Sequence, residues 1–335
     1  FLGIGLIKLH NYYELKVNLN LLIIIIFINP LTWTFGFRGT PDFFSSSLAI
    51  FSIAFLIDDN LSIFKKVIYA LIFGLAIAIK PHAILIFLLF LFTKINFFQL
   101  NSKYILKLFN KLLFVFIFIS IPSIVYYLLC YLLFDIFFFA DVYKSMHFKD
   151  HTTNENSNYY FKNYFKNLIL YFSFLLLSIL PLFFMTYLKE INLKKLLITL
   201  IIILILFYLS INFSIISTIG EMDFGFLNKY IPTYLFQFII YCSLFFSILM
   251  IFDLTKYSQL LTGRNISLII FILSCILLLS VLRPAQRYLL FLIPFIYIFY
   301  SLSYKINLYN VIFYIFITTF INIFLLSNHV ITSKS

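Results

Sequence analysis

The chain has 335 residues, of which 63% are hydrophobic and only 11% are charged, with a net charge of +12 and a mean hydropathy of +1.07. These values exclude an ordinary soluble globular domain. They predict an all-α, polytopic transmembrane helical bundle, because a helix crosses a bilayer with about 20 mainly apolar residues. The run 196–216 meets this requirement without a single charge.

The predicted elements follow from cutting the chain at charges, prolines and polar clusters. Residues 1–7 resemble the end of a truncated N-terminal helix, and about eleven spans follow in a single transmembrane domain, 1–335. The spans are 19–35, 43–57, 67–79, 82–93, 112–134, 167–188, 196–216, 234–252, 266–282, 288–303 and 309–327. Residues 67–93 are predicted to form a hairpin, with one broken helix as the alternative. The longest outer loop is expected at 135–166.

Lysine and arginine distribute unevenly between the two sets of loops, and short cytoplasmic loops carry the excess. The loops assigned to the cytoplasm hold most of the lysines, including Lys8, Lys65, Lys66, Lys94, Lys103, Lys107, Lys111, Lys194 and Lys195. The chain has only four arginines, and three of them fall on the outer side. Guanidinium binds phosphate or carboxylate through two parallel hydrogen bonds, so we expect an anionic ligand there.

The candidate site residues lie in these outer segments. In the stretch FGFRGTPDFF, Arg38 could neutralise a phosphate and Asp42 could supply an oxygen ligand to a metal ion, although a local ion pair explains the turn equally well. Lys80 is either a phosphate ligand or a capping lysine. Arg283 and Arg287, four residues apart in RPAQRYLLFLIP, could hold one anionic group or simply anchor the chain at the interface.

The order of three segments resembles a known family. RGTPD, then VIYALIFGLAIAIKPHAILIFLLFLF, then RYLLFLIP is similar to the C-type integral-membrane glycosyltransferases, in the branch with protein O-mannosyltransferases and the bacterial aminoarabinose transferase. The likeness covers parts of the first third and the last fifth of the chain. It implies that Asp42 matches the second acidic residue of the family's outer loops, Lys80 its hairpin lysine and Arg287 its late arginine. The family's principal acidic motif would precede residue 1, so the general base has no assignment.

The resemblance implies an enzyme that moves a sugar from a polyprenyl-phosphate donor to a glycan, lipid or protein acceptor at the outer or lumenal face. A base would deprotonate the acceptor, while Arg38, Lys80, Arg283 and Arg287 would stabilise the departing phosphate. A divalent metal, Mg or Mn, is expected at Asp42. Beyond this metal no cofactor is expected. Membrane lipids are expected as partners, and nucleic acid is not. The expected location is a cell membrane, bacterial inner membrane rather than endoplasmic reticulum.

Two other functions fit the same composition. A flippase or carrier for lipid-linked oligosaccharides would bind the same phosphates, with cations lining a path through the bilayer. A polymerase or ligase of the O-antigen type would use the same class of donor at the outer face.

Overall fold

The protein is helical throughout the part that the structure describes. The computed structural model describes residues 1–37, 39–95, 102–134, 164–165, 167–174, 179, 182, 193–210, 233–254, 263–280, 286–304 and 306–332. No strand occurs in these ranges, so the all-α class is confirmed. The predicted outer loop 135–166 lies outside them except for two residues.

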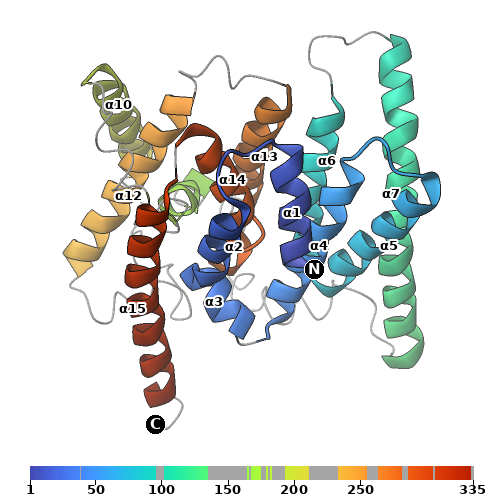
Figure 1. Ribbon diagram of the computed structural model, residues 1–335, viewed down its shortest axis with the longest axis horizontal. Helices are drawn as coiled ribbons and strands as arrows, with labels where there is room; N and C mark the ends of the chain where they lie inside the picture. The colour runs from blue at the N-terminus through green and yellow to red at the C-terminus, as the bar shows by residue number, and fades with distance from the viewer. Residues whose placement is uncertain are drawn as a thin grey trace, which may run out of the picture.

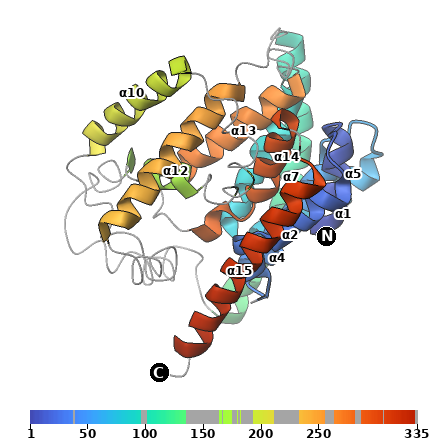
Figure 2. The same cartoon turned by 60° about the vertical axis from the view of Figure 1, so that its left-hand side comes forward.

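The helices form a bundle with α7 along one side and α10 and α12 on the other (Figure 1). The second half of α15 extends away from the rest of the bundle (Figure 2). The elements are α1 (Leu2–Tyr12), α2 (Leu19–Ile28), α3 (Pro30–Phe37), α4 (Pro41–Leu56), α5 (Ile63–Ile79), η1 (Pro81–Ile86), α6 (Phe87–Lys94), α7 (Ser102–Phe134), α10 (Leu193–Ser210), α12 (Thr233–Leu254), α13 (Gly263–Leu279), η6 (Gln286–Leu289), α14 (Ile293–Ser303) and α15 (Leu308–Thr332).

Small residues let α4, α5 and α7 approach one another closely. A Cβ added at Gly74 in α5 would lie 2.2 Å from the carbonyl oxygen of Ile119 and 2.8 Å from Cδ of Pro122, both in α7. The hydroxyl of Ser45 in α4 donates a hydrogen bond to the carbonyl oxygen of Ala76 in α5 at 2.7 Å. Close backbone contact through small residues and hydroxyl bonds between helices is the packing used by helices in membranes.

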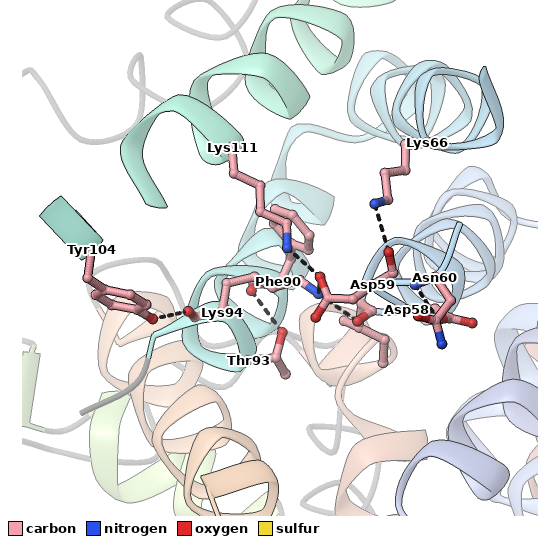
Figure 3. Close-up of polar contacts among 10 residues, drawn as sticks. Asp58, Asp59, Asn60, Lys66, Phe90, Thr93, Lys94, Tyr104 and Lys111 are labelled. Carbon is pink, nitrogen blue, oxygen red and sulfur yellow. Dashed lines mark hydrogen bonds and ion pairs between the residues drawn. The ribbon is translucent and has the colours of Figure 1, made fainter. Parts of the chain in front are cut away.

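The chain reverses direction at Lys80, as the hairpin prediction requires. Lys66 near the start of α5 donates to the carbonyl oxygen of Asp59, and Lys94 at the end of α6 donates to its carboxylate (Figure 3). The two ends of the segment 67–93 therefore lie close together at Asp59. A single broken helix of this length would hold its two ends far apart. Pro81 accounts for the reversal, because the residue before a proline is driven out of the helical conformation.

The predicted span 19–35 is wrong as one helix, since α2 and α3 are separate. The break lies at Asn29 and Pro30, where the missing N–H of proline interrupts the hydrogen-bond ladder. The side chain of Asn29 donates to the hydroxyls of Tyr297 at 3.0 Å and Tyr314 at 3.3 Å, and those hydroxyls lie 2.6 Å apart. All three side chains are buried. This polar network fixes the break against α14 and α15.

Large apolar side chains are exposed on the outer helices. They include Leu106, Ile117, Ile124 and Leu132 on α7, Leu193, Ile201 and Leu204 on α10, and Ile312, Phe316 and Phe320 on α15. By length and composition, the segment Tyr104–Leu133 of α7 is the one helix among the described residues that could cross a membrane, and the other apolar helices offer stretches of 10–17 residues whose side chains are described. Eleven membrane crossings stay a prediction.

Candidate functional site

Two of the five predicted site residues, Asp42 and Lys80, have described side chains. Arg38 and Arg283 lie outside the described residues. Arg287 belongs to η6, whose backbone is described, while its side chain lies outside. The described geometry is therefore the surroundings of Asp42 and Lys80.

The local sequence places Asp42 in the first turn of α4. Gly39 turns the chain with a φ of +59°, a conformation that only glycine adopts without strain. Thr40 is extended, and Pro41 begins the helix at a position where its missing N–H has no partner to lose. The partial positive charge at the helix N-terminus favours the Asp42 carboxylate, whose side chain is only 8% exposed. The fold thus buries an acidic group at the end of the bundle.

The reversal between α5 and η1 brings a lysine and a histidine to this carboxylate. Lys80 Nζ lies 3.7 Å and His82 Nε2 lies 3.9 Å from the same oxygen, Oδ1 of Asp42. Both distances exceed that of a direct hydrogen bond, and Asp42 Oδ1 makes no hydrogen bond within the described part of the chain. Lys80 is one-third exposed, whereas His82 is nearly buried. We call these three residues the Asp42 cluster.

The third segment of the resemblance also reaches the Asp42 cluster. The ring of Tyr288 in η6 lies edge-on to the imidazole of His82, with 5.3 Å between centroids, and the ring of Phe291 lies 6.1 Å away. The segments RGTPD, IKPH and RYLL, far apart in the sequence, therefore converge at one end of the bundle. They bring Asp42, Lys80 and the backbone of Arg287 into one region, while Arg38 and Arg283 stay outside the described residues.

Sequence reasoning missed His82, although it stands two residues after Lys80 in the KPH motif. Its signal was its position at a helix reversal beside a lysine that was already a candidate. A second polar group missed from the sequence is the hydroxyl of Ser46, one turn beyond Asp42 on the same helix. It is buried and makes no hydrogen bond within the described residues.

The chemistry available to the Asp42 cluster is proton transfer and charge stabilisation. A carboxylate beside an imidazole can accept a proton from a hydroxyl or an amine. The ammonium group of Lys80 can stabilise negative charge on a phosphate, and its partial exposure allows contact with a ligand. For the predicted metal at Asp42, His82 is the one potential second ligand near it among the described residues, and no group of three or more His, Cys, Asp or Glu lies together in the described ranges.

The opposite end of the bundle carries a lysine cluster, made of Lys8, Lys66, Lys94 and Lys111 around the Asp58–Asp59 turn between α4 and α5. Figure 3 shows the last three of these lysines. Lys8 Nζ donates to Asp58 Oδ2 at 2.7 Å. Lys94 at 3.0 Å and Lys111 both donate to Asp59 Oδ1, and Lys66 donates to the backbone carbonyl of Asp59. Lysines from four helices, α1, α5, α6 and α7, thus meet at one turn.

These contacts set the ionisation of the turn. The hydrogen bond from Lys8 lowers the pKa of Asp58 below its usual range. Burial by itself would raise the pKa of Asp59, but the hydrogen bonds from Lys111 and Lys94 outweigh it and lower that pKa as well. Both carboxylates are therefore ionised partners of the lysines at neutral pH.

The fourth arginine, Arg264, bonds to residues at the end of α1, the helix that carries Lys8. Arg264 at the start of α13 bonds to the carboxylate of Glu14 at 3.0 Å and to the carbonyl oxygen of Tyr12 at 3.1 Å, where α1 ends. Arg264 is the one arginine that the sequence does not assign to the outer side, and it lies beside the end of α1.

Comparison with protein-family models, curated proteins and solved structures gave no match. The family likeness therefore rests on the residues and their convergence alone.

Proposed function

We propose that this protein is a polytopic membrane glycosyltransferase that moves a sugar from a polyprenyl-phosphate donor to an acceptor at the outer or lumenal face. The observation that carries the proposal is the convergence of Asp42, Lys80 and His82 with η6 at one end of an apolar bundle. These are the segments through which the chain resembles the C-type glycosyltransferases. A buried carboxylate between an ammonium and an imidazole is a form of site suited to proton transfer next to a phosphate.

The membrane placement is supported by the outer surfaces of the bundle. Helices α7, α10 and α15 expose many Leu, Ile and Phe side chains, which a soluble monomer rarely does. The charged side chains of the described residues lie in loops or towards helix ends, where water and lipid headgroups are available. Lys111, well inside the long helix α7, reaches the Asp58–Asp59 turn and so lies at the same end of the bundle. Such a bundle also offers an apolar surface to the prenyl tail of the donor.

In the proposed reaction an acceptor oxygen or nitrogen attacks the anomeric carbon of the donor sugar. The bond between that carbon and the phosphate oxygen breaks, and the electron pair leaves with the polyprenyl phosphate. Asp42, with His82 beside it, takes the proton from the acceptor. Lys80 stabilises the charge that grows on the leaving phosphate, and Arg38, Arg283 and Arg287 are proposed to add to it. A divalent metal at Asp42 has no part in this step, because a metal-bound carboxylate would not take the proton, and His82 is the one other potential ligand near it among the described residues.

A carrier for lipid-linked sugars is the main competing function. It needs cationic or strongly polar groups along a path through the bilayer. Within the described residues, the deeply buried polar network is neutral and its members bond to one another, as Asn29, Tyr297 and Tyr314 do. This arrangement favours a reaction at one end over passage through the middle.

The test reconstitutes the protein in liposomes with radiolabelled polyprenyl-phosphate monosaccharide and measures label that leaves the carrier. We expect Asp42→Asn, His82→Gln, Lys80→Gln and Arg287→Ala each to lower the rate, by about 10²-fold or more for Asp42→Asn and Lys80→Gln. Lys16→Gln is the control, because Lys16 is an exposed cation in the loop after α1.

Three results would redirect the proposal. If Asp42→Asn and Arg287→Ala both transfer sugar at the wild-type rate, the site assignment fails. If label crosses the bilayer but stays on its carrier, the protein is a carrier. If label accumulates in a lengthening lipid-linked glycan, the enzyme is a polymerase or ligase.

A further inference from the structure

A second site candidate lies at the opposite end of the bundle from the Asp42 cluster. Helix α4 spans 16 residues between the two, which corresponds to about 20 Å or more. There the first turns of α5 and the N-terminal part of α7 present Lys65, Lys66, Lys107 and Lys111, which we call the basic rim. Figure 3 shows Lys66 and Lys111 reaching Asp59 from two different helices.

The basic rim has more positive charge than its carboxylates can neutralise. Asp58 is paired with Lys8 at 2.7 Å, and Asp59 already has Lys94 at 3.0 Å. Lys111 shares that same Asp59 oxygen, and Lys66 bonds to a backbone carbonyl, which carries no full charge.

Two amines of the basic rim, those of Lys65 and Lys107, form no ion pair with any residue that the structure describes. Both side chains are exposed. The surplus charge of the basic rim therefore faces outward.

Large exposed apolar side chains are the sequence neighbours of these two lysines. Ile63 and Phe64, in the first turn of α5 next to Lys65, are 71% and 74% exposed. Leu106 and Phe109 are exposed on either side of Lys107 in α7. Water is a poor environment for so many exposed apolar groups, whereas a bilayer surface takes apolar side chains into its acyl region and amines at its phosphates.

We infer that the basic rim is a docking surface for acidic phospholipid headgroups. The amines contact the lipid phosphates, and Ile63, Phe64, Leu106 and Phe109 contact the acyl chains just below. Lysine suits this role because each ammonium is a mobile point charge that needs no fixed orientation of the phosphate. The inference goes beyond the proposed sugar transfer, since the surface lies at the other end of the molecule from the Asp42 cluster, and it rests only on the membrane placement that is part of the proposed function.

Native mass spectrometry of the purified chain in detergent micelles provides the test. Phosphatidylglycerol and phosphatidylcholine are titrated in turn, and the ratio of acidic to neutral lipid retained is measured for wild type and for the double variant Lys65→Gln/Lys107→Gln. We expect a preference for the acidic lipid that falls by about 5-fold for each amine removed. The matched control, Lys65→Arg/Lys107→Arg, keeps the charge and should keep the preference.

The outcomes separate this inference from its rivals. Equal retention of both lipids by wild type, or an unchanged preference in the Gln variant, would overturn it. Displacement of the lipid by soluble glycerol phosphate at equal concentration would point to a site for free phosphate instead and would also overturn it. Thermal unfolding of each variant shows that it is folded, and sugar transfer measured on the same samples shows independently whether the proposed function holds.

Discussion

Replacing Gly74 with alanine tests the arrangement that positions Lys80, because Gly74 lies in the helix that leads to it. The new Cβ would lie 2.2 Å from the carbonyl oxygen of Ile119, where real contacts of this kind do not fall below 3.0 Å. Helices α5 and α7 would have to separate by at least 0.8 Å, the difference between these two distances. Neither obstacle can rotate away, since one is backbone and the other is the ring of Pro122.

The size of the effect follows from two opposing contributions. Overpacking of this kind costs about 1–3 kcal/mol. The higher helix propensity of alanine returns about 1 kcal/mol, so the net loss is about 0–2 kcal/mol for Gly74→Ala and larger for Gly74→Val. Gly3→Ala is the control, because a Cβ at Gly3 in α1 meets nothing within 4 Å and only the favourable contribution remains.

The assay is thermal unfolding in detergent micelles, followed by circular dichroism at a helical wavelength. For a chain of this length, 1 kcal/mol corresponds to a shift in Tm of about 1.5 °C. We expect the order Gly3→Ala, wild type, Gly74→Ala, Gly74→Val from highest to lowest Tm. If Gly74→Val unfolds at the same temperature as Gly3→Ala, α5 and α7 do not cross at this glycine and the described packing is wrong.

Two further predictions concern the other polar networks. Asn29→Leu should lower the free energy of unfolding by about 1–3 kcal/mol. The backbone N–H of Leu31 loses its acceptor, and the hydroxyls of Tyr297 and Tyr314 lose a donor. A variant as stable as wild type in thermal unfolding would show that this network adds no stability. Because the pKa of Asp58 is lowered in the folded state, the stability that its carboxylate contributes is present above the unfolded-state pKa and is lost as pH falls through the folded-state pKa. As Tm is followed from pH 6 to pH 3, wild type should therefore lose more stability than Asp58→Asn, by under about 1 kcal/mol. Parallel curves of Tm against pH for the two proteins would refute this.

The sequence predicts the helices well because its signal for them is strong and local. Spans such as 43–57 and 234–252 coincide closely with α4 (Pro41–Leu56) and α12 (Thr233–Leu254). The hairpin at Lys80 is also readable, since a proline after a charged residue in an apolar run favours a reversal. The break at Asn29 does have a local signal, the Asn29–Pro30 dipeptide, which the prediction of one span overlooked. What the sequence does not reveal is the partners that stabilise the break, since Tyr297 and Tyr314 lie almost 300 positions away.

The candidate site is only partly readable from the sequence for a related reason. Asp42 and Lys80 stand out as isolated charges in apolar surroundings, and both reach the same place. His82 does not stand out, because one histidine after a proline has no local pattern. Its place in the site becomes visible only through its neighbours in the fold, Asp42 far earlier in the chain and Tyr288 far later. The lysine cluster is predictable as an end of the bundle but not as a set of contacts, since the convergence on Asp59 depends on how four helices pack.

The carboxylates at the two ends of the bundle differ in how closely basic groups approach them, and this difference bears on the proposed function. Asp58 and Asp59 are partly exposed, yet each has a lysine at 3.0 Å or less. Asp42 is buried, where a direct hydrogen bond would matter most, yet its nearest described basic groups stay 3.7 and 3.9 Å away. Selection for stability alone would close that gap or replace the acid by an apolar residue. Within the described residues, Asp42 Oδ1 is left without a direct hydrogen bond, which agrees with the role proposed for it as the group that takes the acceptor's proton.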